Sequence, residues 1–247
     1  MLIDHMAAGI MYPFVRYGYY EGSLSIVQLN TIYRALRYIG RTAFPIFCFL
    51  LVEGFVHTKS RLRYALSLLL FGLLSEPVYD TIFYAKDEVF NPNIFASLAA
   101  NKDLLPNQCN VYFTLLIGFL VIWSTDRCRR FVLDKNRFRP VVWIFCCIFT
   151  AIGALISYKI SSDYDVSGVI LISIFYMLKY HSPMNIISGY LFIANNSTEF
   201  ASFPGFILMA LYNGKRGRNL GYFKYLFYLF YPLHLLILYL CRCALVC

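Results

Sequence analysis

The sequence has few charged residues for a chain of 247 residues. Only 14% of them are Asp, Glu, Lys or Arg, whereas soluble domains carry roughly 25%. Hydrophobic residues make up 60% of the chain, and its mean hydropathy is +0.60. Such a chain has too little polar surface for a water-facing globule and too many apolar residues for a disordered protein. The composition therefore excludes an ordinary soluble protein and predicts several membrane-spanning helices.

Several sequence motifs are also missing. No CxxC spacing occurs, and six of the eight cysteines lie in apolar runs, where cysteine behaves as a small hydrophobic residue. A zinc ribbon or a redox motif is therefore not indicated. There is no Gly-rich phosphate loop, internal repeat or low-complexity segment. No cleavable signal peptide is expected, because the first apolar stretch contains Asp4 and His5 and no basic region precedes it.

The apolar runs divide the chain into nine expected spans. A helix needs about 20 apolar residues to cross a bilayer. The spans lie near 1–19, 39–56, 62–84, 110–125, 140–158, 166–180, 184–195, 200–213 and 223–245. The seventh and eighth are short and fit either two tilted helices or one broken hairpin. The sequence predicts an all-α polytopic membrane helix bundle, with residues 1–247 in a single integral-membrane domain.

Basic residues gather in three of the loops between these spans. The loop 125–139 has six basic and two acidic residues, the loop 213–224 has four basic and no acidic residues, and a third basic loop covers 57–63. Lys and Arg collect on the cytoplasmic side of a membrane, so these loops are predicted to face the cytoplasm. Acidic residues mark the intervening loops, which include Asp163 and Glu199. The predicted N-terminus is inside and the C-terminus outside.

Residues 20–40 do not fit this alternation. They are outside by parity, yet they contain Arg34 and Arg37, and Arg41 follows directly. Spacings of three and four place these arginines on one stripe of an expected amphipathic helix. Two interpretations remain open. The helix lies at the headgroups with its arginines snorkelling, or it dips into the protein to hold an anion.

Ionisable residues inside the apolar runs are the strongest indication of function, because each costs at least about 2.5 kcal/mol to insert. They are Asp4, His5, Glu53, His57, Glu76, Asp80 and His234. Glu53 and His57 share one helix face, and so would Glu76 and Asp80 unless Pro77 kinks the turn. We therefore expect several polar faces to converge on the interior of the bundle.

Three chemistries are consistent with this set. Histidine is the usual general base near neutral pH, and an adjacent carboxylate can fix its tautomer. Glu53, His57, Glu76 and Asp80 could instead gather a metal in an intramembrane hydrolase. A proton relay in a transporter is the third interpretation. For any single histidine, a position at a helix end near the interface remains the structural alternative.

Five blocks of the sequence carry a resemblance to a known family. They are MLIDHMAAGIMYP at 1–13, YRALRYIGRTAFPIFCFLLVEGFVHTKSRLRYALSLLLFGLLSEPVYD at 33–80, QCNVYFTLLIG at 108–118, DYDVSGVILI at 163–172 and FYLFYPLHLLIL at 227–238. Together they resemble the TraX family, which includes the conjugative pilin N-acetylase. The likeness covers almost the whole chain in order, and its most specific parts are GRTAFPIF…EGFVHT and SEPVYD.

The resemblance implies an acetyl-CoA-dependent acyltransferase in the bacterial cytoplasmic membrane. The family is similar to a wider group of integral-membrane acyltransferases that take acetyl-CoA from the cytosol. The implied acceptor is an exported peptide, protein or glycan, and the lipid bilayer is the surrounding partner. No metal and no nucleic acid are expected. A metal-dependent intramembrane hydrolase is the alternative, followed by a transporter.

The resemblance also suggests roles for individual residues. His5, oriented by Asp4, becomes the catalytic base, and direct attack on the thioester is expected rather than an acetyl-enzyme. Glu53 and His57 would orient the acceptor or provide a second base. The remaining candidates are Arg34, Arg37 and Arg41 for the CoA phosphates, Glu76 and Asp80 for a cationic acceptor amine, and Asn110 and Thr114 for the thioester carbonyl.

Overall fold

The computed structural model describes residues 1–16, 20, 22–84, 93–100, 108–134, 140–196, 198–214, 221 and 224–246, and all regular structure among them is helical. The predicted all-α fold is thus confirmed for the described residues. In chain order, the helices are α1 Leu2–Met6, η1 Ala7–Met11, α2 Tyr12–Arg16, α3 Ile26–Gly40, α4 Ala43–His57, α5 Arg61–Phe83, α6 Ile94–Ala100, α7 Val111–Asp134, α8 Pro140–Lys159, α9 Asp165–Met177, α10 Met184–Ala194, η2 Glu199–Ser202, α11 Phe203–Ala210 and α12 Lys224–Val246.

Five helices among the described residues are long and apolar enough to cross a membrane. They are Ile26–His57, which joins α3 to α4, and then Arg61–Phe83, Val111–Val132, Pro140–Lys159 and Tyr225–Leu245. The apolar helices Asp165–Met177, Met184–Ala194 and Glu199–Ala210 are shorter. A helix of this size is only about 16–20 Å long, against a hydrocarbon core of about 30 Å. The predicted number of nine spans is therefore not confirmed, whereas a multi-pass membrane protein is supported.

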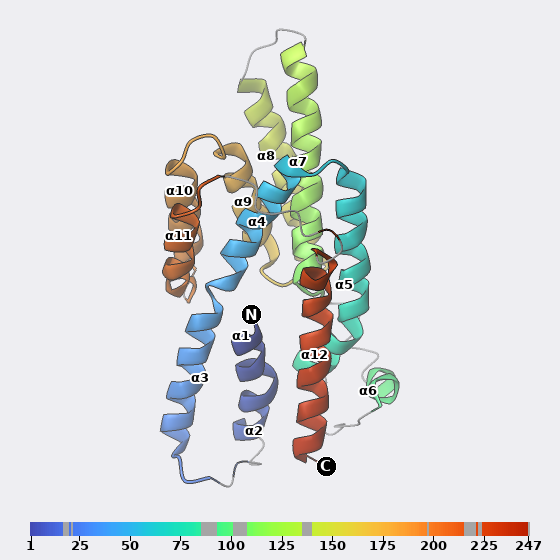
Figure 1. The fold of residues 1–247 in the computed structure, drawn as a ribbon, viewed down its shortest axis with the longest axis vertical. Coiled ribbons are helices and arrows are strands. Elements are labelled where there is room, and N and C mark those ends of the chain that lie inside the picture. The colour runs from blue at the N-terminus through green and yellow to red at the C-terminus, as the bar shows by residue number, and fades with distance from the viewer. Residues whose placement is uncertain are drawn as a thin grey trace.

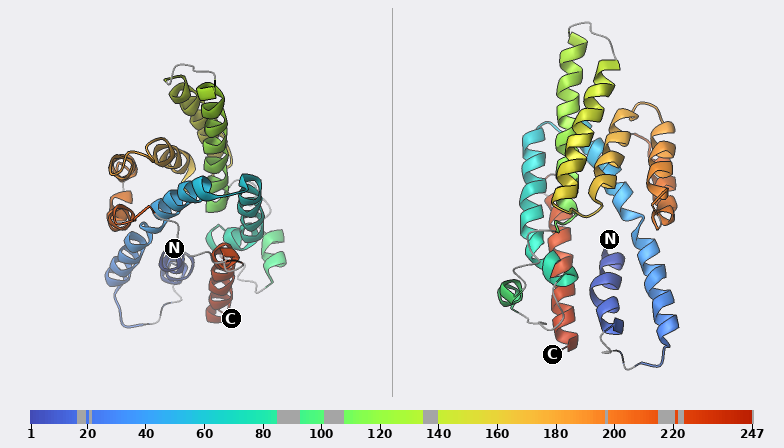
Figure 2. Two further views of the ribbon diagram at one scale, coloured as in Figure 1. Left: turned by 45° about the horizontal axis from the view of Figure 1, so that its top comes forward. Right: turned by 180° about the vertical axis from the view of Figure 1, so that it is seen from behind.

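The helices form two groups along the long axis of the molecule. Figure 1 shows the α7–α8 hairpin at one end, with α9, α10 and α11 beside it. At the other end lie α3, α12 and the N-terminal helix, which consists of α1, η1 and α2 (Leu2–Arg16). Helix α4 crosses the middle, and the N-terminus lies near mid-height rather than at an end. The view from behind in Figure 2 shows the same arrangement. The N-terminal helix packs against both α3 and α12, so residues at the two ends of the sequence are brought together.

The buried core is largely aromatic. Phe44, Phe55, Phe119 and Phe175 are almost fully buried, and the rings of Phe55 and Phe119 meet edge to face with centroids 5.3 Å apart. These residues come from α4, α7 and α9, which pack on one another. Such pairs contribute roughly 0.5–1.5 kcal/mol beyond the burial of their area. They make α4, α7 and α9 a rigid frame, to which the loops of the candidate site are attached.

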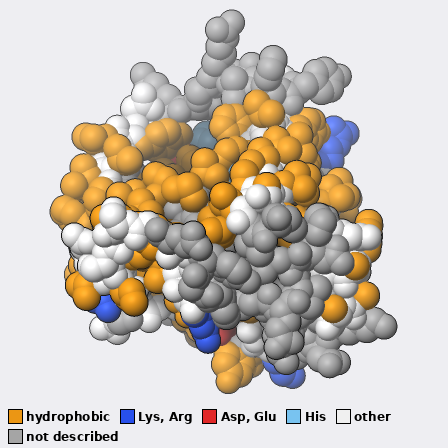
Figure 3. Space-filling view, turned by 90° about the horizontal axis from the view of Figure 1, so that it is seen from below, with side chains coloured by type: hydrophobic (Ala, Val, Ile, Leu, Met, Phe, Trp, Pro, Cys, Tyr) orange, Lys and Arg blue, Asp and Glu red, His pale blue; other side chains and the backbone are white. Residues whose placement is uncertain are grey.

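The outer faces of the long helices are apolar. Large aliphatic side chains are exposed along α5, including Leu66, Leu70 and Leu73, and along α8, including Ile144 and Ile152. Hydrophobic side chains also dominate the coloured surface at the lower end of the molecule, where Lys and Arg are few (Figure 3). Extended apolar patches of this kind mark surfaces that face lipid or a partner. With the five long helices, they support a multi-pass membrane protein.

The predicted amphipathic helix is α3. Its start is fixed by a capping box, in which Ser25 Oγ accepts from the Gln28 amide and Gln28 Oε1 accepts from the Ser25 amide at 2.9 Å. It ends at Gly40, where α3 passes close to α1. A Cβ atom at residue 40 would overlap the Cβ atom of Asp4. Glycine is therefore required there for the close approach of the two helices.

The N-terminal helix is also attached to α5 and α12. Its middle turn is a π-helix, η1, a form that often occurs at functional sites. Arg242 of α12 is buried and donates from Nη1 to the carbonyl oxygens of Gly9, at 3.4 Å, and Ile82, at 2.7 Å. One side chain thus joins three helices. This attachment determines where Asp4 and His5 lie.

The predicted membrane orientation rests partly on loops outside the described residues. These are 85–92, 101–107, 135–139 and 215–220, which contain much of the charge used in the sequence analysis. The orientation stays a prediction.

Candidate functional site

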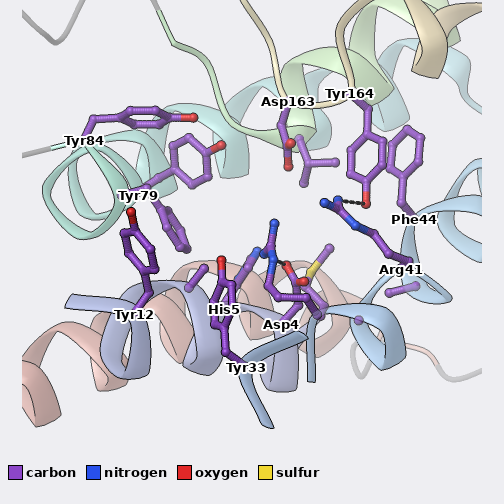
Figure 4. Close-up of a pocket in the computed structure, with 17 residues that line it drawn as sticks. Asp4, His5, Tyr12, Tyr33, Arg41, Phe44, Tyr79, Tyr84, Asp163 and Tyr164 are labelled. Atoms are coloured by element: carbon purple, nitrogen blue, oxygen red, sulfur yellow. Dashed lines mark hydrogen bonds and ion pairs between the residues drawn. The ribbon is translucent and has the colours of Figure 1, made fainter. Parts of the chain in front are cut away.

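A cavity of about 280 Å³ lies where the N-terminal helix, the α3–α4 junction, the end of α5 and the α8–α9 loop meet. Figure 4 shows its charged side chains and a ring of tyrosines pointing toward a common space. The volume is near the lower end of the usual range for ligand pockets, about 300–1,000 Å³, so it suits one end of a large ligand. Its charged and aromatic lining residues are Asp4, His5, Arg37, Arg41, Asp163, Tyr12, Tyr33, Phe44, Tyr79, Phe83, Tyr84 and Tyr164.

Two of the three predicted arginines line the cavity, and each is paired with a carboxylate. Arg37 Nη1 donates to Asp4 Oδ2 at 2.7 Å. Arg41 Nη1 lies 3.2 Å from Glu199 Oε1 and 3.3 Å from the Tyr164 hydroxyl. A guanidinium has five N–H donors, so both arginines retain donors for a ligand. The carboxylates keep the cavity close to electrically neutral.

Arg34 does not line the cavity and is exposed. It precedes Arg41 by seven positions, so it lies on the same stripe of α3 but about 10 Å farther along the axis. The stripe therefore runs from Arg41 inside the cavity, past Arg37 at its edge, to Arg34 on the surface. The sequence spacing predicted the stripe but could not show its direction.

His5 is buried, with 7% of its surface exposed, and its hydrogen-bond partner is a second histidine. His5 Nδ1 lies 2.8 Å from His234 Nε2, and His234 Nδ1 lies 2.8 Å from the carbonyl oxygen of Phe230. The two imidazole rings are nearly parallel, with 10° between their planes and centroids 5.0 Å apart. Asp4 is paired with Arg37 instead, because consecutive residues on a helix point in different directions.

His234, the hydrogen-bond partner of His5, is not among the catalytic residues predicted from the sequence. Its position within an apolar span marked it as unusual, and Pro232 two residues earlier is a further signal. Pro232 has no amide N–H, which leaves the Tyr228 carbonyl without its helical donor. The hydroxyl of Tyr112 donates to that carbonyl at 2.9 Å. This bond joins α12 to α7 next to the histidine pair.

The loop between α8 and α9 closes the cavity from above. Tyr164 adopts a left-handed conformation with φ of 62°, and its ring stacks on Phe44 with centroids 3.6 Å apart. Asp163 points into the cavity (Figure 4). Burial, together with the nearby charge of Asp4, raises the pKa of Asp163 to about 6, against the opposing effect of Arg41. From the sequence, Asp163 and Glu199 are expected only to mark outer loops.

Asn110 and Thr114 are buried beside this loop but outside the cavity. The Thr114 hydroxyl donates its one hydrogen to the Asp163 carbonyl oxygen, which can only accept, and Thr114 Oγ1 also lies 2.9 Å from Ser162 Oγ. The Asn110 amide group donates to the Gly72 carbonyl oxygen at 2.9 Å. Their polar atoms thus bind the protein itself, and this arrangement favours a role in holding the loop rather than in binding a thioester.

Glu76 and Asp80 also lie outside the cavity lining, although Tyr79 and Tyr84 on the same segment are part of it. Glu76 Oε2 accepts from the Asn110 backbone amide at 3.0 Å and from its side chain. Asp80 is buried, and its Oδ1 has no hydrogen-bond partner among the described residues. Glu76 therefore joins α5 to the start of α7.

Glu53 and His57 are at the opposite end of α4 from the cavity. His57 Nε2 lies 3.6 Å from Glu53 Oε2, and both side chains are partly exposed. Because α4 has its cavity residues at its N-terminal end, a rise of 1.5 Å per residue puts His57 about 20 Å away. The structure therefore does not bring this pair together with His5.

A second polar cluster surrounds Asp126 near this end of α4. Asp126 Oδ2 lies 2.7 Å from Arg61 Nη1 and 3.0 Å from Arg130 Nε, and its Oδ1 accepts from the Tyr176 hydroxyl at 2.9 Å. The Lys179 ammonium lies 4.2 Å from the centre of the Tyr176 ring. Burial and the neighbouring Arg129 lower the pKa of Lys179 to about 8. In the sequence, Asp126 is only one of the two acidic residues of the basic loop 125–139.

No group of three or more His, Cys, Asp or Glu side chains suited to a metal occurs in the described part of the chain. The hydrolase interpretation required Glu53 and His57 to meet Glu76 and Asp80. In the structure the two pairs have separate partners, on α4 itself and on α5 with Asn110. The geometry therefore gives that alternative no support.

Comparison with known proteins gives two matches. The profile of the family described as TraX protein matches residues 1–242. The chain is also similar to the probable fimbrial assembly protein FimC, serogroup H1, of Dichelobacter nodosus. The two are 28% identical over 222 residues, which covers 83% of this chain and 82% of that protein. No solved structure matches the chain.

Proposed function

The chain belongs to the TraX protein family, and from this membership and the cavity around His5 we propose that it is a membrane-embedded acyltransferase. The proposed reaction moves an acetyl group from acetyl-CoA to the amine or hydroxyl of an exported peptide, protein or glycan. The similarity to a protein named for fimbrial assembly supports an exported acceptor. The observation that carries the proposal is a buried histidine beside a small cavity that also holds two arginines.

Acetyl transfer from a thioester needs a base for the acceptor proton and a donor for the carbonyl oxygen. In the proposed step, the acceptor nitrogen or oxygen attacks the thioester carbonyl carbon and gives its proton to His5. The carbon–sulfur bond then breaks, and the thiolate leaves with that proton. No further reactant is required. The rings of Phe83 and Tyr231 pack against the His5 ring, with centroids 5.2 and 5.7 Å away. They limit the access of water, which would otherwise hydrolyse acetyl-CoA.

The arginine stripe suits the rest of the donor. The acetyl end would occupy the cavity, which is too small for a whole nucleotide, and the phosphates would lie outward along α3. Arg41 and Arg37 would then contact the phosphates that lie nearest the thioester, and Arg34 the phosphate nearest the surface. Guanidinium groups bind phosphate through two parallel hydrogen bonds. In this proposal all three arginines contact acetyl-CoA, but at different distances from the surface.

The test compares cells that carry the wild type, His5→Ala or His57→Ala. Acetylated peptides and glycans are quantified in the exported fraction of each strain. We expect His5→Ala to lose the acetylated acceptor and His57→Ala to retain it, because His57 lies about 20 Å from the cavity. Detergent-purified His5→Ala should still bind CoA. An acetylation pattern that is the same in all three strains would contradict the proposed function.

A further inference from the structure

The buried histidine pair has no carboxylate partner. Neither His5 nor His234 forms an ion pair with Asp or Glu among the described residues, although Asp4 is the next residue to His5. Both rings are buried, with 7% and 4% of the residue surface exposed. Their polar nitrogens are instead arranged in a chain from His5 to His234 to the backbone carbonyl of Phe230. The chain has a direction, because its last member can only accept a hydrogen bond.

The direction fixes the position of each proton. A carbonyl oxygen has no hydrogen to donate, so His234 Nδ1 must carry a proton. In a neutral imidazole the other nitrogen is then an acceptor, so His234 Nε2 accepts from His5 Nδ1. His5 Nε2 is left without a proton. Neutral rings are favoured here because a buried charge without a counter-ion is expensive.

The opposite arrangement fails on the same geometry. If His5 carried its proton on Nε2, His5 Nδ1 would be an acceptor and His234 would need its proton on Nε2. His234 Nδ1 would then place a lone pair 2.8 Å from the lone pairs of the Phe230 carbonyl oxygen. Two acceptors at hydrogen-bond distance repel each other, and the buried carbonyl would lose a donor.

We propose that His234 is a positioning residue that holds His5 in the Nδ1-protonated tautomer and so presents Nε2 of His5 as the proton acceptor. The expected kinetic effect rests on the proposed function, whereas the tautomer of His5 does not depend on it. His234 is well placed for the role, since its ring is stacked on Phe230 and meets the edge of Tyr231. A side chain of α12 thereby orients His5 of the N-terminal helix.

A neutral histidine orients the base differently from a carboxylate. When His5 Nε2 takes the proton of the acceptor, its Nδ1–H becomes a stronger donor, and the bond to His234 becomes charge-assisted. The second proton stays on Nδ1. At rest, the pair adds no charge to a cavity in which Arg37 and Arg41 already have carboxylate partners. The base is therefore neutral until it accepts a proton.

Nitrogen NMR of the full chain, labelled with ¹⁵N-histidine and held in lipid nanodiscs, tests the tautomer directly. The chain has four histidines, and single His→Gln variants assign their signals. We expect the His5 Nδ1 signal to be of the protonated type and the Nε2 signal of the unprotonated type at pH 8. A protonated Nε2 in the wild type at that pH would overturn the proposal without the need for any variant at residue 234.

Two replacements of His234 then test its role. His234→Gln keeps an acceptor oxygen for His5 Nδ1, whereas His234→Leu removes it. The Leu variant should give a mixed tautomer signal at His5 and a kcat at least about tenfold lower, with the KM for acetyl-CoA unchanged, and the Gln variant should recover most of both. Asp4→Asn is the matched control and should leave the His5 nitrogen signals unchanged, since Asp4 pairs with Arg37.

The outcomes separate this inference from the proposed function. If His234→Leu leaves the His5 signals as in the wild type, His234 does not position His5 and the inference is wrong. If the signals change as expected but the wild type transfers no acetyl group, the histidine chain stands and the acyltransferase proposal falls. Should the Leu variant not fold, the wild-type spectrum and the Gln variant still decide.

Discussion

Replacing Arg37 with Gln and Asp4 with Asn in the same chain should weaken CoA binding at least tenfold. The proposed contact between Arg37 and CoA is a charge-assisted hydrogen bond, which contributes about 1.5–3 kcal/mol to the binding free energy. That range corresponds to roughly 10- to 150-fold in affinity. The double replacement is needed because Arg37 also pairs with Asp4 at 2.7 Å.

The single variant Arg37→Gln would mix two effects. Only 16% of the Asp4 side chain is exposed, so loss of Arg37 leaves a largely buried carboxylate without its partner. Removal of one member of a buried pair is costly, about 3–5 kcal/mol when the pair is fully buried. The single variant would therefore lower stability as well as affinity, whereas the double variant removes both charges together. A comparison of thermal unfolding for the two variants shows how far this separation succeeds.

Calorimetric titration with CoA and with dephospho-CoA measures the donor contact. Because Arg37 is proposed to contact the inner phosphates, the double variant should lose affinity for CoA and for dephospho-CoA alike, whereas a loss for CoA alone would place Arg37 at the 3′-phosphate instead. Arg34→Gln tests the exposed end of the same stripe and should have the smaller effect. Arg130→Gln is the matched control, because Arg130 pairs with Asp126 at 3.0 Å outside the cavity lining.

Equal CoA affinity for the wild type and the double variant would refute this reasoning. The donor phosphates would then belong elsewhere on the molecule. The basic side chains of Arg129 and Lys179 near Asp126 would be the next place to test, since the pKa of Lys179 is already lowered by burial and by Arg129. A bound phosphate would raise that pKa again.

Three further predictions concern the base, the loop and the helix contact. His5→Ala should lower the rate of acetyl transfer by about 10²- to 10⁴-fold and His57→Ala only slightly, as measured by CoA release with the acceptor identified in cells. The raised pKa of Asp163, about 6, means that the folded state holds its proton more tightly than the unfolded state; stability from this carboxyl is therefore lost as the pH rises through 6. Asp163→Asn should raise the melting temperature at pH 7.5 but not at pH 4, and equal effects at both pH values would contradict the assignment. Gly40→Ala should cost about 1–3 kcal/mol through its overlap with Asp4, and an unchanged melting temperature would show that α1 and α3 can separate freely.

The long helices were largely predictable from the sequence because their length and apolar character are local properties. The expected spans 62–84, 140–158 and 223–245 correspond to α5, α8 and α12 within two residues at each end. Helix α7 was expected to end near 125 and continues to Asp134. Its last turns carry basic residues, which reduce hydropathy but favour the helix as strongly as apolar residues do. Hydropathy therefore marked the end of the apolar segment rather than the end of the helix.

The number of spans could not be derived in the same way. The segments 166–180, 184–195 and 200–213 are as apolar as the longer ones, but turn and bend residues at 178–183 and at 195–196 separate them into short helices. A window of hydropathy cannot distinguish a span from a shorter helix that packs against other helices. Contacts of α10 with α9 and α11 show that these short helices pack side by side.

The candidate site was predicted where its residues are close in the sequence or repeat along one helix. Asp4 and His5 are consecutive, and Arg37 and Arg41 are separated by one helical turn. Their meeting in one cavity required only that the N-terminal helix and α3 pack together. Asp163 and Glu199 were recognised as charged residues, but their loop positions suggested solvent rather than a cavity.

The hydrogen bond between His5 and His234 spans 229 residues of sequence, and this explains why the pair could not be foreseen. Its formation depends on α12 packing beside the N-terminal helix, which Arg242 secures through the Gly9 and Ile82 carbonyl oxygens. Loss of these Arg242 hydrogen bonds should therefore change the orientation of His5, although neither bond involves His5. Arg242→Leu is expected to disturb the His5 nitrogen signals as His234→Leu does, whereas a variant with normal His5 signals would show that helix packing alone aligns the two rings.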